Sequence, residues 1–256
     1  GINFQNIPYN RKSINPIYEL YILLRIIYLY KKIKPDIVHH IAAKPIIYGS
    51  IAAKLCRIKS VLNAPVGLGY VFSSDNFKAK VLRPILIFLF KKFINTHNGK
   101  NQRNKVIFEN FDDLNYFIKI GAVKRDYASV IRGAGVKVSK KIFKNKNKKV
   151  IPTITLLARM LKDKGVREFV AAAKLINSDK LNGRFLLVGD TDKLNPSSLK
   201  KSTLKKWDEE KIIEWKGWVD DTEKILKETD ILCLPSYREG LPKALIEGAA
   251  LGLPIV

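Results

Sequence analysis

The chain has 256 residues, 46% of them hydrophobic, which suffices for one large or two ordinary globular domains. No segment holds the roughly 20 apolar residues that a membrane-spanning helix requires. Cys56 and Cys233 stand apart, with no metal-ligand spacing around them. These features exclude a disulfide scaffold and a structural zinc site, and they favour a reducing, cytoplasmic compartment.

The formal net charge of +24 is concentrated in the first half of the chain. Residues 1–149 contain 29 Lys and Arg against 7 Asp and Glu, whereas residues 150–256 contain 18 against 16. A basic surface attracts anionic lipid, nucleic acid or phosphorylated acceptors. A general bias toward Lys, Ile and Asn is the alternative cause, but such a bias should act on both halves alike.

Strand-like apolar runs alternate with helical stretches in the first half of the chain. We expect residues 1–138 to form one domain, with strands at 36–40, 60–64, 104–109 and 128–132 and helices at 44–55, 79–94 and 111–120. The apolar run at 81–93 has Arg83, Lys91 and Lys92 at its margins. It reads first as a core helix, with an amphipathic helix at a membrane interface as the alternative.

The alternation restarts after a polar, basic and aperiodic stretch at 139–150, which reads as a linker. We expect residues 151–256 to form a second domain, with strands at 154–158, 184–188, 211–215 and 230–234 and helices at 166–176, 197–209, 222–228 and 242–251. The predicted fold class is α/β, with two Rossmann-like, doubly wound parallel-sheet domains facing a cleft. Because the chain starts with Gly1 and stops inside an apolar run, we expect both domains to be incomplete.

The most informative segment runs from Pro235 to the end of the chain. A buried strand breaks into a polar loop carrying Glu239, and Pro242 then opens a helix that contains Glu247. Backbone N–H groups at a helix start hold phosphate, and carboxylates accept hydrogen bonds from hydroxyl groups. The segment therefore indicates binding of a sugar nucleotide.

A second loop supplies cations for such a ligand. Arg159 ends a predicted strand, and Lys162 and Lys164 precede the next helix. Guanidinium and ammonium groups at a strand's carboxyl end suit diphosphate oxygens. A solvated basic loop is the alternative if these residues are considered alone.

Five motifs together resemble the retaining glycosyltransferases of family 4, which have the two-domain GT-B fold. They are Asp36-Ile-Val-His39, Val66-Gly-Leu-Gly-Tyr-Val-Phe72, Ala158-Arg-Met-Leu-Lys-Asp-Lys-Gly165, Trp215-Lys-Gly-Trp-Val219, and Pro235-Ser-Tyr-Arg-Glu-Gly-Leu-Pro242 with Glu247. The sequence of residues 44–72 is most similar to that of bacterial members that extend polyprenyl-diphosphate-linked sugars for capsule, O-antigen or glycan assembly.

This resemblance assigns roles to the donor-side residues. It implies that Glu247 binds the ribose and that Glu239 binds the transferred sugar, while Gly240 and Leu241 present backbone N–H groups. Arg159 and Lys164 are implied to stabilise the leaving diphosphate, so no metal is expected. An ion pair between Lys243 and Glu247 is the structural alternative for that glutamate.

Three further assignments come with the resemblance. The turn formed by Gly217, Trp218 and Val219 is implied to lie against the nucleobase, although packing is the first expectation for the indole rings of Trp215 and Trp218. His39 and the loop of Gly67 and Gly69 are implied to face the acceptor. Many family members carry a His just before that loop, where this chain has Val66.

The implied activity is transfer of a hexosyl or N-acetylhexosaminyl group, with retention, from a UDP-sugar to a polyprenyl-diphosphate-linked or saccharide acceptor. The implied location is the cytoplasmic, inner face of the cell membrane, on an anionic surface and without nucleic acid. A GT-B epimerase or phosphorylase and a glycoside hydrolase are alternatives. A basic nucleic-acid-binding protein is the non-enzymatic alternative.

Overall fold

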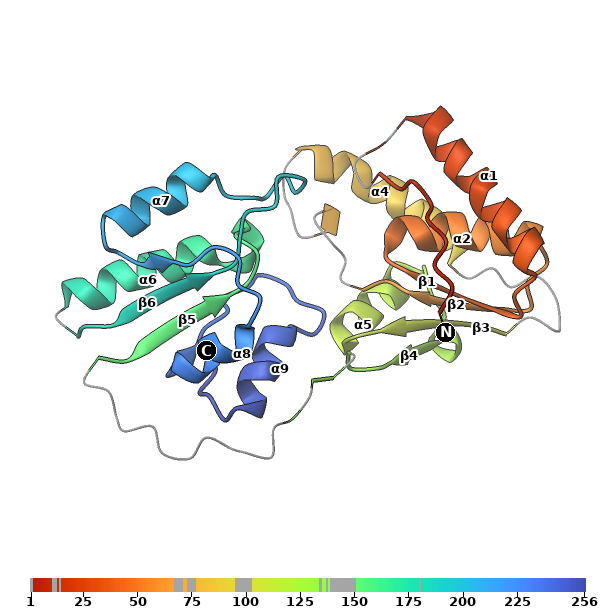
Figure 1. Cartoon of the computed structure of the whole chain (residues 1–256). Coiled ribbons are helices and arrows are strands. Elements are labelled where there is room, and N and C mark those ends of the chain that lie inside the picture. Colours follow the sequence, from red (N-terminus) through yellow and green to blue (C-terminus); the bar gives the residue numbers. More distant parts are fainter. Residues whose placement is uncertain are drawn as a thin grey trace. The chain divides into compact units, whose positions relative to one another are not determined.

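The computed structural model divides into two compact units, residues 1–132 and 133–256 (Figure 1). It describes residues 2–10, 13, 15–66, 71–72, 77–94, 103–133, 135–136, 138, 151–179 and 181–256. The predicted linker at 139–150 and the glycines Gly67 and Gly69 lie outside these ranges. Among the described residues, no helix combines the length and apolar character needed to cross a bilayer.

The first unit is built on a parallel four-stranded sheet in the order β1-β2-β3-β4. Its strands are β1 (Ile37–Ile41), β2 (Ser60–Ala64), β3 (Arg103–Phe108) and β4 (Ala128–Val130), and its helices are α1 (Pro16–Ile33), α2 (Ala43–Leu55), α4 (Phe77–Phe93), α5 (Phe111–Lys119) and the 3₁₀ turn η1 (Arg125–Tyr127). Asn15 and Asn110 cap α1 and α5 by accepting hydrogen bonds from first-turn N–H groups. The strands and helices predicted for this half are confirmed to within a few residues.

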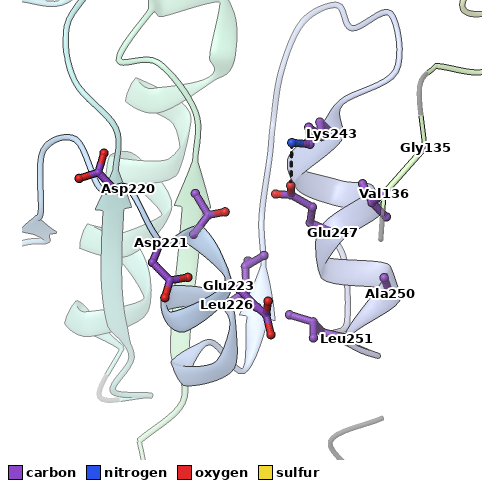
Figure 2. A pocket seen from close by; sticks show the side chains of 11 residues that line it. Gly135, Val136, Asp220, Asp221, Glu223, Leu226, Lys243, Glu247, Ala250 and Leu251 are labelled. Carbon is purple, nitrogen blue, oxygen red and sulfur yellow. Dashed lines mark ion pairs between the residues drawn. The ribbon is translucent and has the colours of Figure 1, made fainter. Parts of the chain in front are cut away.

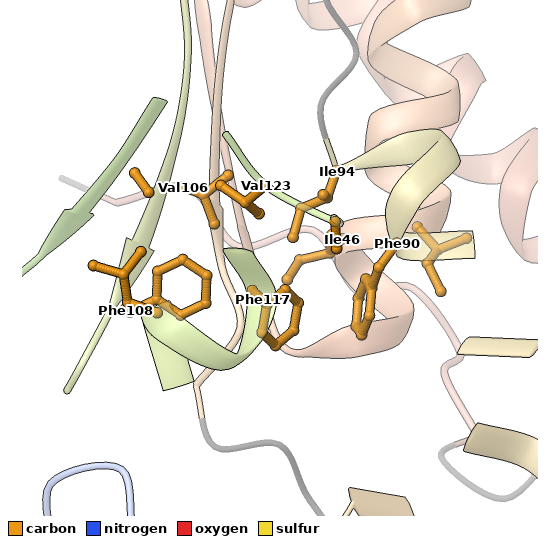
Figure 3. Close-up of a cluster of buried hydrophobic side chains, with 11 residues drawn as sticks. Ile46, Phe90, Ile94, Val106, Phe108, Phe117 and Val123 are labelled. Atoms are coloured by element: carbon orange, nitrogen blue, oxygen red, sulfur yellow. The ribbon is translucent and has the colours of Figure 1, made fainter. Parts of the chain in front are cut away.

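The main core of this unit is aromatic (Figure 3). Phe90 of α4 and Phe108 of β3 both contact Phe117 of α5, with ring centroids 5.2 and 5.1 Å apart. Ile46 of α2 and Val106 of β3 complete the same buried cluster. One continuous core therefore ties three helices to the sheet.

The second unit holds a parallel sheet in the order β7-β6-β5-β8. Its elements are β5 (Thr153–Leu157), η2 (Lys162–Lys164), α6 (Val166–Ser178), β6 (Arg184–Val188), α7 (Lys201–Glu209), β7 (Glu214–Trp215), α8 (Thr222–Glu228), β8 (Ile231–Leu232) and α9 (Lys243–Ala250). The chain moves outward from β5 to β7 and then returns to the other side of β5. The strand order thus reverses between β5 and β8, as expected for a doubly wound sheet.

The strand expected at 230–234 is reduced to Ile231 and Leu232. Two further predicted elements of this unit are also shorter than expected. The helix expected from residue 197 begins only at Lys201. The residues before it are instead hydrogen-bonded to the loop after β5: Lys162 N–H donates to the Ser197 carbonyl, and Leu199 N–H donates to the Met160 carbonyl (both 2.9 Å). The strand expected at 211–215 retains only Glu214 and Trp215, because Lys211 has a left-handed backbone, with φ of 55°. Both differences arise from local backbone geometry that apolar periodicity does not report.

A buried polar network is centred on His40 of β1. In the His40 ring, Nε2 lies 2.8 Å from the Tyr30 hydroxyl, and Nδ1 lies 2.8 Å from Asn63 Oδ1. Because a carboxamide oxygen only accepts, Nδ1 donates to Asn63, and in the neutral imidazole Nε2 then accepts from the Tyr30 hydroxyl. Burial lowers the pKa of His40, and the hydrogen bond to Asn63 offsets this only in part.

The network predicts a specific acid sensitivity of the first unit. A His whose pKa is lowered by folding takes up a proton more readily when unfolded, so stability is full above about pH 6.5 and falls below it. We expect the protection of β1 and β2 amides against hydrogen exchange, measured by mass spectrometry and corrected for the intrinsic pH dependence of exchange, to fall between pH 7 and pH 5. His40→Gln should flatten this dependence, and His39→Gln, which alters an exposed ring, should preserve it. Equal profiles for both variants would contradict the assignment.

Candidate donor site

The predicted donor residues of the second unit gather around the reversal in strand order. Arg159, Lys162 and Lys164 lie in the loop after β5, residues 158–165, and Glu239 lies in the loop after β8, residues 233–242. Because β5 and β8 are parallel neighbours, both loops leave the same edge of the sheet. Ligands of open α/β sheets bind at this place.

The two loops are joined by their backbones. Tyr237 N–H donates to the Asp163 carbonyl (3.0 Å), and the Ser236 hydroxyl donates to the same oxygen (3.1 Å). Gly165 has φ of 70°, and a Cβ atom there would lie 1.9 Å from the Pro235 carbonyl oxygen. Only glycine permits this approach, so Gly165 sets the separation of the loops.

Lys164 and Glu239 form a direct ion pair across the junction. Lys164 Nζ lies 2.5 Å from Glu239 Oε1, and the two side chains are only 19% and 22% exposed. The sequence placed these residues in one site without predicting that they contact each other. The predicted sugar-binding carboxylate is thus the counterion of a predicted diphosphate-binding cation.

Arg159 is paired in the same manner, but with a residue that the sequence analysis did not select. Its Nη1 lies 2.8 Å from Asp192 Oδ2, in the loop after β6. That loop is bonded to the Arg159 loop, because Met160 N–H donates to the Asp190 carbonyl (3.0 Å). Asp192 carries no motif, and only the proximity of the two loops identifies it.

Asp190 anchors the start of the β6 loop. Burial raises the pKa of its carboxyl, but hydrogen bonds from Thr191 and Lys201 together outweigh burial and lower it. The carboxylate therefore stays ionised, and it holds Lys201 at 3.0 Å. These contacts within the loop and to α7 give Asp190 a structural role.

Glu247 lines a pocket of about 520 Å³ beside α8 and α9 (Figure 2). The pocket also carries the carboxylates of Asp220, Asp221 and Glu223 and an apolar side formed by Leu226, Ala250 and Leu251. Lys243, which is exposed, lies 3.2 Å from Glu247, so the ion pair considered as an alternative does form. Such an exposed i,i+4 pair contributes only a few tenths of a kcal/mol. The same carboxylate remains at the pocket wall to accept hydrogen bonds from hydroxyl groups.

The turn at 217–219 is fixed by its glycine and by Trp215. Gly189 N–H donates to the Gly217 carbonyl (2.7 Å), and the Trp215 indole N–H donates to the Gly189 carbonyl (2.9 Å). Trp215 packs against the core, as expected. Trp218 does not: it is 72% exposed, so the packing prediction for its ring is wrong. Val219 is half-buried and leads directly into Asp220 of the pocket.

The segment that begins α9 differs slightly from expectation. Pro242 is the N-cap, and the helix proper starts at Lys243. Gly240 and Leu241 precede the cap and are half-buried. The Leu241 side chain lies against Gly133, where a Cβ atom would be 2.6 Å from Leu241 Cδ2.

The acceptor-side predictions receive less structural detail. His39 is exposed on β1, on the strand face opposite the buried His40. Gly67 and Gly69 fall outside the described residues. In the part of the chain that the structure covers, no group of three or more His, Cys, Asp or Glu side chains could hold a metal ion.

Two family models match the chain, one in each half. The model described as "Glycosyl transferase 4-like" matches residues 1–97, and "Glycosyl transferases group 1" matches residues 151–256. Each match lies within one of the predicted domains.

Two curated relatives are bacterial transferases. The Campylobacter jejuni N,N'-diacetylbacillosaminyl-diphospho-undecaprenol alpha-1,3-N-acetylgalactosaminyltransferase is 29% identical over 97% of this chain. An Escherichia coli UDP-Gal:alpha-D-GlcNAc-diphosphoundecaprenol alpha-1,3-galactosyltransferase is also 29% identical, over 96% of it. The chain spans 65% and 63% of the length of these relatives.

Solved structures share the fold at low identity. Sucrose-phosphate synthase from Thermosynechococcus elongatus matches with a TM-score of 0.71 and 18% identity, over 95% of this chain and 62% of its own. Anabaena HepE in complex with UDP-glucose matches with a TM-score of 0.67 and 15% identity, over 94% and 64%. These matches and the two parallel sheets confirm the predicted GT-B fold.

The junction of the two loops predicts a destabilising substitution. Gly165→Ala should lower the free energy of unfolding by the left-handed backbone penalty of about 1–2 kcal/mol plus the clash with Pro235. Gly121→Ala is the matched control, because Gly121 has φ of 68° and its nearest atom is a flexible Lys91 carbon at 3.9 Å. Thermal unfolding should separate the two variants clearly. Equal losses would mean that the loops are not held at this contact.

Proposed function

We propose that the chain is a glycosyltransferase that transfers a sugar from a nucleotide donor to a lipid-linked acceptor; the two family-model matches and the GT-B fold support this proposal. The donor is a UDP-sugar, the transferred group a hexosyl or N-acetylhexosaminyl residue, and the anomeric configuration is retained. The observation that carries the proposal is the Lys164–Glu239 pair at the strand-order reversal, with Glu247 on the adjacent helix.

The charges of the second unit suit the two ends of a nucleotide diphosphate. Arg159 and Lys164 supply positive charge at the loop after β5, where the diphosphate leaves. The pocket that contains Glu247 is lined by carboxylates, which accept hydrogen bonds from ribose hydroxyls and repel phosphate. The nucleoside therefore occupies the pocket and the diphosphate lies outside it, toward the cations.

Donor binding exchanges one set of charge partners for another. Arg159 and Lys164 are each paired with a carboxylate in the unliganded protein. A diphosphate that takes over Lys164 frees Glu239 to accept hydrogen bonds from the sugar hydroxyls. Cleavage of the glycosyl–phosphate bond then develops negative charge beside cations that are already in place.

The leaving diphosphate also accounts for retention in this proposal. The acceptor hydroxyl attacks from the face on which the phosphate departs, and a phosphate oxygen takes the acceptor's proton. Glu239, Gly240 and Leu241 hold the sugar, and the turn at 217–219 lies against the base. His39 and the loop of Gly67 and Gly69 contact the acceptor.

The two curated relatives act on undecaprenol-diphosphate-linked sugars, as their names state. We propose an acceptor of the same class for this chain, or a saccharide, in surface polysaccharide or glycan assembly. Such an acceptor places the enzyme on the cytoplasmic face of an anionic membrane. The charge excess of residues 1–149 fits this location.

The rival activities differ in what they release. An epimerase or phosphorylase would not transfer sugar from a nucleotide donor to an acceptor. A hydrolase would release free sugar, and its activity would not depend on a nucleotide. A nucleic-acid-binding protein would shift long RNA or DNA in a salt-sensitive manner. Radiolabelled UDP-sugars incubated with a lipid-linked acceptor test the proposal, because only the proposed transferase moves the label into the lipid-linked product.

We expect Glu247→Ala to weaken UDP binding about tenfold or more, because hydrogen bonds to a charged group contribute about 1.5–3 kcal/mol. Isothermal titration calorimetry measures the affinity. Lys243→Met is the control, since it breaks the same ion pair but leaves the carboxylate in the pocket. It should retain UDP affinity within about threefold, a margin below 1 kcal/mol. Equal weakening by both substitutions would reduce Glu247 to a structural role.

Lys164→Met should act mainly on turnover. We expect kcat to fall by about 10²–10³, as for removal of other preorganised charge-stabilising groups. Lys174→Met, which alters an exposed lysine of α6 outside the site, is the control and should leave kcat nearly unchanged. The measurement is the sugar-transfer rate at saturating donor. Equal losses of kcat in both variants would contradict the assignment of Lys164 as the leaving-group cation.

A further inference from the structure

Helix α4 of the first unit is apolar on both of its faces. Ala79 and Phe90 are buried, and Ile94 just beyond the helix joins them in the aromatic core. On the opposite face, Phe77, Val81, Ile85 and Phe88 are 81%, 49%, 51% and 60% exposed. Their spacing of four, four and three residues puts them in one stripe along the helix. A helix that only covered a sheet would be polar along this stripe.

The exposed stripe is bordered by positive charge. The helix contains five basic residues and no acidic one. Lys80, Lys91 and Lys92 are exposed, and Lys92 Nζ lies 5.8 Å from the centre of the Phe88 ring. Large apolar side chains with lysines at their border are typical of helices that lie in the headgroup region of a bilayer.

The sheet of the first unit does not cover the exposed stripe of α4. The helix connects β2 to β3, and each of these strands is paired on both sides. Helix α1 also exposes apolar side chains, among them Ile17 and Leu24, but it precedes β1, the edge strand of the described sheet. We therefore base the inference on α4.

We propose that the outer face of α4, formed by Phe77, Val81, Ile85 and Phe88 with Lys80, Lys91 and Lys92, docks the protein on an anionic lipid bilayer. The four apolar side chains enter the interface, and the lysines contact anionic headgroups. This inference rests on the proposed function, because a lipid-linked acceptor requires the enzyme to work at a membrane surface. It adds the surface through which the contact is made.

Vesicle co-sedimentation tests the inference. We expect the chain to bind vesicles of equimolar phosphatidylcholine and phosphatidylglycerol more strongly than phosphatidylcholine alone, with binding that weakens as salt rises. Ile85→Ser/Phe88→Ser should lower the partition coefficient by about tenfold or more, because it removes two large apolar side chains from the interface. Phe88→Trp should show blue-shifted fluorescence on vesicle addition.

A matched control is Leu175→Ser/Leu181→Ser, which removes two leucines, 67% and 72% exposed, from the second unit. It should bind vesicles like the unmodified chain. Unchanged binding by the α4 variant would overturn the inference. So would a dimer in size-exclusion chromatography that the α4 substitutions dissociate, since the stripe would then bind a second copy.

UDP calorimetry on the same variants separates this inference from the proposed function. Unchanged UDP affinity in the α4 variant, with lost vesicle binding, supports both. A chain that binds anionic vesicles through α4 but does not bind UDP would refute the proposed function and leave the docking surface standing. A chain that binds UDP but not vesicles would refute the docking surface and leave the proposed function standing.

Discussion

The donor half of this protein depends on the close approach of two loops at the point where the strand order reverses. The loop after β5 can reach the loop after β8 only because Gly165 has no side chain beneath the Pro235 carbonyl. Once the backbones are fixed by the bonds from Ser236 and Tyr237 to Asp163, Lys164 and Glu239 are adjacent. Geometry that the chain sets for packing therefore also sets the separation of a cation and a carboxylate.

The electrostatic consequence is that the positive charges of the site are balanced by carboxylates of the protein itself. Its cations are paired with carboxylates from neighbouring loops, which limits the cost of holding Lys164, whose side chain is only 19% exposed, away from water. A diphosphate competes for those cations, whereas a neutral sugar does not. The carboxylate-lined pocket beside α9 favours hydroxyl and N–H donors instead. In our proposal, this division of charge orients the nucleotide sugar in the site.

Prediction from sequence succeeded where the signal is local. The limits of β2, β6 and α8 were predicted to the residue, since each is an uninterrupted apolar or helical run with clear breaks. The pairing of Lys164 with Glu239 spans 75 residues and was not predicted as a contact. Asp192, and the pocket residues Asp220, Asp221 and Glu223, were missed because acidic residues in loops and at helix starts are common and only the fold brings these together. Trp218 was misjudged because an indole ring is usually buried, whereas here its N–H bonds to Asp220 at the surface.

A crystal structure of the protein with UDP bound would test the central claim most directly. Our account predicts ribose hydroxyls within hydrogen-bond distance of Glu247 and a diphosphate whose oxygens have replaced Glu239 as the partner of Lys164. UDP bound away from the β5–β8 reversal would contradict it. So would a diphosphate in the acidic pocket with the Lys164–Glu239 pair intact.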